Sequence, residues 1–478
     1  MPFFPSLEIG KRALLAQQLG LDTTSNNVAN VNTPGYSRRR IELVETEPVK
    51  LAAGTIGTGV RAGRIVRLQH EFFDKEIRNS IATKKYNETH IFTFQRLEAI
   101  LGEGSDTGLD RYIQRFFDAL NDLALEPESL QRREAVLSTA TSMINAFRTT
   151  GQKIRVLRED IKSKAETRVA TINKLLEQIA SLNAKIGIES IEGTGATAPL
   201  EDQRTKLLEQ LAEYLNIDVR YDNNNMVNIA VSGSTILTGP NAHTLELKET
   251  IDSATQERTL ALNIVDTQGN AILQLHPAAG EIASLLEHYN VLLDDKDSSN
   301  GFSIAKQLNR LVEALVTRIN AISVTGYGLD DTGTAPPGRN FFDPAGTTLE
   351  TIALDAAIAS SPRDIPTSSA AGEPGNNAVA LQMADVINDE NFLDNTTLMD
   401  FYTNLIGKLG LAGQNAKLGF DTAKAVESQM ITQREAMAGV NLDEEAVQLV
   451  KFQKAYQAAA RIVSVANELL DTLVRLGQ

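Results

Sequence analysis

The chain has 478 residues, with 46 lysines and arginines against 61 aspartates and glutamates, and it contains neither cysteine nor tryptophan. With 42% hydrophobic and 22% charged residues, it can bury cores and is not disordered as a whole. The lack of cysteine excludes disulfide frameworks, thiolate zinc sites and cysteine nucleophiles. There is no basic stripe that could neutralise a run of phosphates, and no stretch of the roughly 20 apolar residues that a membrane span needs. We therefore expect no nucleic acid as a partner and no membrane span.

The negative charge is concentrated in one part of the chain. Residues 281–400 carry 18 acidic and 6 basic side chains, whereas residues 1–80 carry 8 acidic and 11 basic ones. The start of the chain does not resemble a secretory signal, because Glu8, Lys11 and Arg12 interrupt the stretch that would have to be apolar. If the protein leaves the cytoplasm, we expect it to use another route.

Apolar residues recur every seven positions near the start of the chain, at Leu7, Leu14, Leu21 and Val28. This spacing places them on one narrow stripe of a helix, as in the seam of a coiled coil. The companion core positions are small or polar: Gly10, Gln17 and Thr24. The helix therefore has a thin apolar face. An ordinary surface helix would also fit this pattern when it is taken by itself.

A turn-rich segment, SNNVANVNTPGYSRRR at residues 25–40, follows this stripe. Pro34 disfavours a helical conformation at Thr33, and Gly35 can take the positive φ that a type II turn requires. Tyr36 adds an aromatic anchor with a polar tip. Four asparagines can bond to the local backbone and end the helix: Asn26, Asn27, Asn30 and Asn32. The segment thus predicts a helix end followed by a tight turn.

Helical periodicity dominates the middle of the chain. After a short β-prone stretch at Arg39–Val44 and Val60–Val66, the segment from Ser129 to Ile188 keeps apolar residues at steps of three, four or seven. A helix of that length spans about 90 Å, which suits a rod-shaped bundle. Shorter helical patterns follow at Glu201–Leu215, Ala305–Ile322 and Thr397–Met437.

Two regions depart from this helical pattern. Apolar residues alternate within Ile217–Leu275 and are separated by turn signals, which predicts a small, mostly antiparallel β unit. Residues 326–377 are rich in glycine, proline, serine and threonine, and predict an irregular excursion. The expected fold class is mainly α with an inserted β unit, arranged as an elongated helical rod.

A second seven-residue repeat lies at the far end of the chain, at Leu442, Leu449, Tyr456, Val463 and Leu470. Companion residues fill the second core position: Phe452, Ala459, Ala466 and Leu473. Asp443, Glu444 and Glu445 fall in the first turn, where the helix dipole favours negative charge. Because each terminal stripe is incomplete alone, we expect the two helices to form a coiled-coil pair and to contact neighbouring subunits.

The chain offers little that could support catalysis. His70-Glu71 begins like a helical zinc-protease motif, but position i+4 is Asp74 and not a second histidine. The acidic run that begins at Asp295 lacks the glycine and the terminal glutamate of a calcium loop, since Asn300 and Lys306 occupy those positions. We therefore predict no catalytic residue, no cofactor and no metal site, and we do not expect an enzyme.

The two ends carry a family resemblance. NNVANVNTPGY followed by Ser37-Arg38 resembles the N-terminal signature of bacterial flagellar axial proteins, which comprise rod, hook and hook-associated subunits. The segment Gly439–Val474 is similar to the C-terminal signature of the same group. Rod and hook subunits of the family are mostly β in their interior, so the helical middle resembles the hook-associated subunits. Phe341-Phe342 and the segment Thr397–Gly410 add to this likeness, whereas Arg38-Arg39-Arg40 is more basic than the usual continuation and suggests a salt-bridged strand start.

The resemblance implies a structural subunit that joins hook to filament and is required for filament assembly and motility. We expect a terminal coiled-coil domain lining the tube (1–66 and 434–478), a helical rod (67–215 and 280–433, with an excursion at 325–380) and an outer β domain (216–279). The implied partners are copies of the chain in a tubular assembly, hook protein on one side, a second junction protein on the other, and a cytoplasmic export chaperone at the C-terminal helix. The implied location is the extracellular flagellum, reached by type III export without a cleaved signal peptide.

Three alternatives remain open on the sequence. The chain could be another axial component, such as a hook or rod subunit or the second junction protein. It could carry an enzymatic insertion, for instance a glycan or peptide hydrolase. It could also be a helical adaptor in the cytosol.

Overall fold

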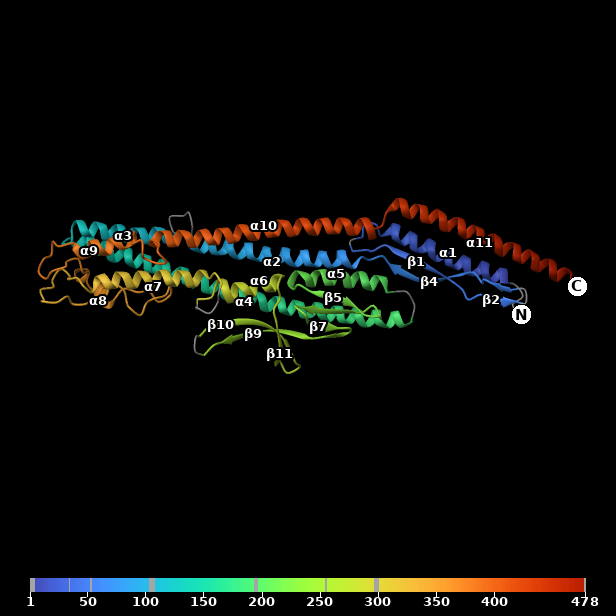
Figure 1. Cartoon of the computed structure of the whole chain (residues 1–478), viewed down its shortest axis with the longest axis horizontal. Coiled ribbons are helices and arrows are strands. Elements are labelled where there is room, and N and C mark those ends of the chain that lie inside the picture. Colours follow the sequence, from blue (N-terminus) through green and yellow to red (C-terminus); the bar gives the residue numbers. More distant parts are fainter. Residues whose placement is uncertain are drawn as a thin grey trace.

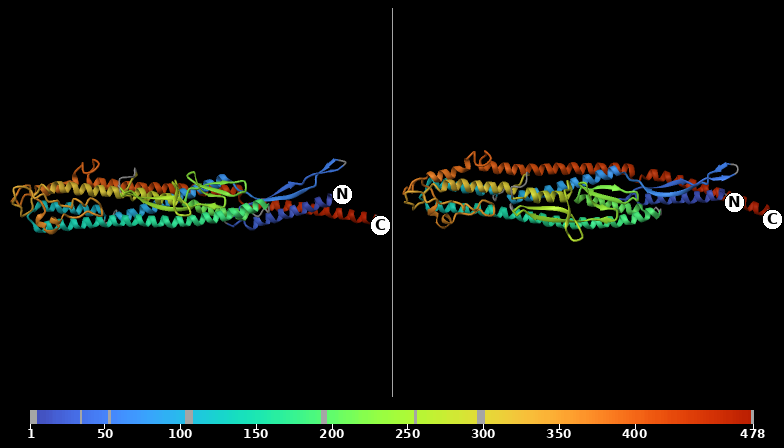
Figure 2. Two further views of the ribbon diagram at one scale, coloured as in Figure 1. Left: turned by 90° about the horizontal axis from the view of Figure 1, so that it is seen from below. Right: turned by 60° about the horizontal axis from the view of Figure 1, so that its bottom comes forward.

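The computed structural model describes residues 5–33, 35–51, 54–102, 108–192, 197–253, 256–295 and 301–476. Figure 1 shows an elongated molecule in which long helices run along the long axis, and both chain ends lie at the same pole. The β strands of the middle of the chain lie along one side of the helices (Figures 1 and 2). No helix in the described part of the chain is long and apolar enough to cross a membrane.

The pole that holds the chain ends, which we call the terminal unit, contains two helices and two small antiparallel pairs of strands. The helices are α1 (Pro5–Ala29) and α11 (Leu442–Leu476). The strands are β1 (Arg39–Glu45) paired with β4 (Val60–Arg67), and β2 (Val49–Leu51) paired with β3 (Gly54–Ile56).

The rod is a bundle of long helices around two apolar cores, one of which it shares with the β unit. Its elements are α2 (Glu71–Leu101), α3 (Leu109–Leu125), α4 (Leu130–Glu192), α5 (Ala198–Tyr214), α6 (Glu281–Glu287), the π-helix η1 (His288–Leu292), α7 (Ile304–Ser323) and α10 (Leu398–Ala438). The expected helix at Ser129–Ile188 is confirmed by α4, whose 63 residues span about 95 Å. In Figure 1, α10 lies beside α2 and continues toward α11.

The β unit is formed by two antiparallel sheets. One sheet has the order β5 (Asp218–Tyr221), β6 (Val227–Val231), β7 (Ser234–Thr238) and β8 (Asn241–Ala242); the other has the order β11 (Ala271–Leu275), β10 (Arg258–Val265) and β9 (Thr244–Ile251). Val227, Ile229 and Val231 are fully buried and alternate with less buried residues, which is the period-2 pattern seen in the sequence. The expectation of an antiparallel β unit is confirmed.

The excursion at the opposite pole and the segment that follows it contain only short helices: α8 (Ala356–Ser360), η2 (Pro362–Asp364), α9 (Ala378–Asp385) and η3 (Val386–Asn388). Phe341 and Phe342 anchor it, because both side chains are fully buried in the rod core. The Asn320 side chain fixes their backbone by accepting from both N–H groups and donating to the Phe342 carbonyl. The irregular segment is therefore packed firmly against α7. The expected fold class, a helical rod with a small inserted β unit, is confirmed.

Candidate assembly site at the paired chain ends

Helices α1 and α11 pack against each other in antiparallel fashion. A Cβ added at Gly10 would lie 2.8 Å from Val463 Cγ2, and one added at Gly20 would lie 2.6 Å from Phe452 Cε1. The small residues of α1, which give that helix its thin apolar face in the sequence, thus let the two backbones approach closely. Gly20 accommodates the Phe452 ring directly.

The buried residues of α11 occupy one of its two predicted heptad positions, the one that includes Phe452, Ala459 and Ala466. Ala459 and Ala466 are 4% and 3% exposed, and Glu445 occupies the same heptad position two repeats before Ala459. Other predicted seam residues are partly buried: Leu7, Leu14, Leu21, Leu449, Phe452, Val463 and Leu470.

Three predicted seam residues are more exposed than the rest. Leu442 is 52% exposed, and Val28 and Tyr456 are each 37% exposed. Leu442 begins α11 one turn before Glu445, which already lies opposite the end of α1. The side chain of Leu473 lies outside the described residues.

Glu445 is a buried carboxylate at a core position of this helix pair, and both of its oxygens are satisfied. Arg38 Nε donates to one oxygen at 2.7 Å, and Asn27 Nδ2 donates to the other at 3.0 Å. Arg38 Nη1 also donates to Glu444 at 2.6 Å. A buried charge that is paired and fully hydrogen-bonded can be tolerated where an unpaired one could not. The loop after α1 is thereby joined to the first turn of α11.

Asn27 explains much of the N-terminal motif. It is 1% exposed and makes four hydrogen bonds, the full capacity of an amide side chain. Its oxygen accepts from the Tyr36 hydroxyl (2.8 Å) and the Arg39 N–H (3.0 Å), while its nitrogen donates to the Arg39 carbonyl (2.8 Å) and to Glu445. Asparagine is suited to this position because it donates and accepts at once. Burial raises the pKa of Tyr36, so its hydroxyl stays protonated and able to donate.

The expected turn follows Asn27. The Tyr36 N–H donates to the Thr33 carbonyl at 3.1 Å, and Gly35 has φ +82°, as predicted for the position after Pro34. Pro34 itself lies outside the described residues. Asn26 and Asn30 bond to each other locally, Thr33 donates to the Asn30 side chain, and Asn32 is exposed.

A second apolar stripe of α11 lies beside the seam and is largely uncovered by α1, although Ile462 at its edge comes close to Gly10. Its residues, which we call the outer stripe, are 47–67% exposed: Val447, Val450, Ile462, Val465 and Leu469. A shallow hollow of about 290 Å³ opens between the start of α1, at Ser6, and the part of α11 formed by Ile462, Val465, Ala466 and Leu469. None of these residues of the outer stripe occupies a predicted heptad position of α11. The signal that could have found the stripe is a second set of apolar residues on the same helix.

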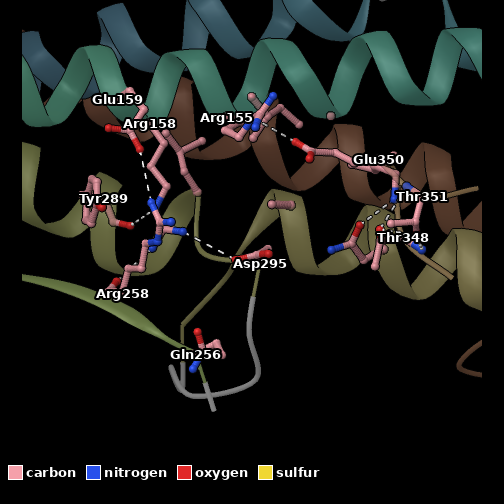
Figure 3. Close-up of a pocket in the computed structure, with 16 residues that line it drawn as sticks. Arg155, Arg158, Glu159, Gln256, Arg258, Tyr289, Asp295, Thr348, Glu350 and Thr351 are labelled. Atoms are coloured by element: carbon pink, nitrogen blue, oxygen red, sulfur yellow. Dashed lines mark hydrogen bonds and ion pairs between the residues drawn. The ribbon is translucent and has the colours of Figure 1, made fainter. Parts of the chain in front are cut away.

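A larger cavity, of about 360 Å³, lies between α4, η1, α7, β10 and the excursion, and Figure 3 shows the side chains that line it. Its charged side chains are paired with one another across these elements. Arg155 bonds to Glu350 (3.2 Å), Arg158 to Asp295 (3.5 Å), and Arg258 lies 3.6 Å from Glu159. These pairs connect α4 to the excursion, to the segment after η1 and to β10. No group of three or more potential metal ligands occurs among the described residues.

Comparisons with known proteins match the two ends and the middle separately. Residues 7–36 match the family described as flagella basal body rod protein, and residues 432–476 match the C-terminal family of the flagellar basal body rod FlgEFG proteins. Residues 94–342, more than half of the chain, match the helical domain of flagellar hook-associated protein FlgK. The chain belongs to the FlgK family.

Relatives of the FlgK family match almost the whole chain. Flagellar hook-associated protein 1 of Bacillus subtilis is 28% identical over 98% of this chain and 98% of that protein. The protein of the same name from Salmonella typhimurium is 24% identical over 97% of this chain and 98% of its own length. The solved structure of the flagellar hook junction protein FlgK from Burkholderia pseudomallei shares the fold, with a TM-score of 0.61 at 13% identity, over 76% of this chain and 99% of that one.

These findings confirm the expected family and the expected function, a structural subunit of the bacterial flagellum at the hook–filament junction. Membership of the FlgK family also places the chain in the flagellum and among other flagellar components. The expected roles of the motif and seam residues, and the expected domain boundaries, stay predictions.

Proposed function

We propose that this FlgK-family chain polymerises into a tube that joins hook to filament and is required for the filament to assemble. The terminal unit would form the inner wall, because its helix pair leaves an apolar surface uncovered at one pole of the molecule. The observation that carries this proposal is the outer stripe of α11, five apolar side chains that are 47–67% exposed in the single chain. Exposed apolar patches of this kind mark interaction surfaces.

Burial of the outer stripe supplies the driving force. Each fully buried side chain of this size contributes on the order of 1.5–3 kcal/mol before the entropy of ordering is subtracted. The stripe and the covered seam lie on different faces of α11, so a neighbouring copy can cover the stripe without displacing α1. A contact between two different surfaces that does not close on itself builds a tube or a helical filament.

The remaining parts of the chain would lie farther from the axis. In this arrangement residues 1–66 and 434–478 line the tube, 67–215 and 280–433 form its wall, and 216–279 face solvent. The concentration of acidic residues in 281–400 supports a solvated outer surface for that part of the wall. The two ends of the tube would contact hook protein on one side and a second junction protein on the other.

The exposed outer stripe also bears on how the chain is kept in the cytoplasm and then exported. An uncovered outer stripe would be an aggregation hazard in the cytoplasm, which supports a chaperone that covers α11 before export. The chain has no cysteine, so it can pass through a type III channel as an unfolded thread without disulfides to reduce. We propose this route without a cleaved signal peptide, and a structural role without enzymatic activity.

Complementation of cells that lack this chain tests the proposal. Without the chain, electron microscopy should show hooks without filaments, and flagellin should accumulate in the medium. The double variant Val465→Lys, Leu469→Lys should fail to restore filaments, whereas Val156→Lys, at a 50% exposed apolar position of the rod, should restore them. Normal filaments with the double variant would refute the role of the outer stripe, and filaments without the chain would refute the junction role.

Proteolysis of the purified monomer tests how the terminal unit behaves before assembly. If the pair α1–α11 is ordered only on incorporation, residues 1–60 and 440–478 should be digested first, before the rod. Equal resistance of the ends and the rod would show that the helix pair is already stable in the free subunit.

A further inference from the structure

The run Arg38-Arg39-Arg40, which departs from the usual sequence after the motif tyrosine, divides between two parts of the molecule. Arg38 binds Glu444 and Glu445 of α11, inside the terminal unit. Arg39 points to the rod instead, where its Nη2 lies 3.4 Å from Asp202 Oδ2 on α5. The basic run therefore connects the loop after α1 to α11 on one side and to the rod on the other.

Arg67 meets the same carboxylate from the paired strand. Arg39 and Arg67 are direct partners at one end of the β1–β4 ladder, so their side chains leave the sheet at the same rung. Arg67 Nε donates to Asp202 Oδ1 at 2.7 Å, and its Nη2 donates to Thr205 at 3.1 Å. The side chains of Arg67 and Asp202 are 6% and 12% exposed, so solvent screens this pair less than a surface ion pair.

The joint between the terminal unit and the rod, where these residues meet, is not held together by apolar packing. The two apolar cores of the rod include no residue of the terminal unit, as far as the described residues go. A cavity of about 610 Å³ opens at the joint instead, lined by Tyr36, Arg67, Asp202, Arg434 and Gly439 among others. Two bodies joined by a small polar contact are expected to move relative to each other unless something fixes them.

We infer that Asp202, with Arg39 and Arg67, is an electrostatic latch that sets the orientation of the terminal unit relative to the rod. With the latch closed, the two arginines hold β1 and β4 against α5. With it open, the terminal unit turns about its backbone connections to α2 and α10. This device is a property of the isolated chain and does not depend on the proposed place in the tube.

Double electron–electron resonance on the full chain tests the latch. Because the chain has no native cysteine, Gln414→Cys on α10 and Gln457→Cys on α11 would be the only residues to carry a spin label. Both positions are exposed, and they lie on either side of the joint between the rod and the terminal unit. The variant Asp202→Asn should at least double the width of the distance distribution or shift its maximum. The matched control Asp160→Asn removes an Arg–Asp pair within the rod, Arg96–Asp160 at 2.8 Å, and should leave the distribution unchanged.

Salt and a second variant complete the test. Raising the salt from 0.1 M to 1 M shortens the screening length from about 10 Å to about 3 Å, but the pair is largely buried, so salt should broaden the distribution of the parent chain less than Asp202→Asn does. Arg67→Gln should reproduce the effect of Asp202→Asn, and helix content measured by circular dichroism verifies that each variant is folded. The same distribution in the parent and in both variants, whether narrow or broad, would overturn the latch.

Discussion

Asn27 and Glu445 are 418 positions apart in the chain and are joined by a buried hydrogen bond of 3.0 Å. This contact links the two family signatures directly, because each residue lies in one of them. The N-terminal motif therefore acts as a partner for the C-terminal helix as well as a turn. Asn27 bonds to Tyr36 and Arg39 of the loop, and Arg38 of the same loop bonds to the Glu445 carboxylate.

Replacing Asn27 by alanine should loosen the terminal unit and leave the rod intact. The change removes four hydrogen bonds and leaves the Arg39 N–H and one oxygen of Glu445 without their partner, and each buried group left unsatisfied costs about 1–3 kcal/mol. Hydrogen exchange should show faster exchange in α1, in α11 and at the start of β1, with no change in the rod. The control Asn26→Ala changes an exposed side chain beside it, and equal effects of the two variants would contradict the central role of Asn27.

The sequence predicted the elements that follow from local periodicity. It indicated α4, the antiparallel β unit and the pairing of the two ends, because steps of two, three, four or seven residues report which face is buried. It could not place Glu445 in a core position, since that burial depends on Asn27 and Arg38 at the other end of the chain. Nor could it separate the seam of α11 from the outer stripe: both are apolar, and only the position of α1 distinguishes them. Asn320, which fixes Phe341 and Phe342, belongs to no periodic pattern at all.

Gly20 should be the most sensitive small residue of the seam. Gly20→Ala places a Cβ 2.6 Å from the Phe452 ring, so the helices must separate or the ring must rotate, and the α1–α11 pair should lose about 1–3 kcal/mol through overpacking. Gly407→Ala is the matched control, because nothing lies within 4 Å of a Cβ at that helical position. The control should stabilise α10 by about 0.5–1 kcal/mol. Thermal unfolding monitored by hydrogen exchange distinguishes the two variants. A stabilising effect of Gly20→Ala would refute the close approach of α1 and α11.

The stability of the rod should fall in mild acid because of His288. This residue of the π-helix η1 is 1% exposed, its ring lies 4.2 Å from that of His90 on α2, and burial lowers its pKa to about 3. His90 and Lys164 of α4 also disfavour its charge, whereas Glu287 favours it. Between about pH 6.5 and pH 3 the unfolded chain binds a proton here that the folded chain does not, so the free energy of unfolding decreases as the pH falls through this window.

His288→Leu isolates this effect. The variant should lose about 1.4 kcal/mol less per pH unit than the parent within the window, because one fewer proton is taken up on unfolding. Urea unfolding at several pH values gives the slope. His243→Gln, at an exposed position in the β unit, should keep the slope of the parent. A slope that is the same in all three chains would show that His288 does not control the acid sensitivity.

Arg133 should hold the excursion to the rod. Its guanidinium is fully buried and donates to the carbonyls of Pro127 (2.8 Å) and Ile365 (2.6 Å) and to the Thr367 hydroxyl (2.8 Å), while burial lowers its pKa to about 10. Arg133→Lys keeps the charge but loses the planar fork, so at most part of these bonds can re-form.

We expect Arg133→Lys to lower the free energy of unfolding by about 2–4 kcal/mol, because buried carbonyls lose their donors. Limited proteolysis should then cut first within 361–378, the segment that these bonds anchor. Arg132→Lys, at the neighbouring and more exposed position beside Glu126, provides the matched control and should change neither the cleavage pattern nor the melting temperature. Cleavage elsewhere in Arg133→Lys, with residues 361–378 still protected, would mean that Phe341 and Phe342 hold the excursion without help from the arginine.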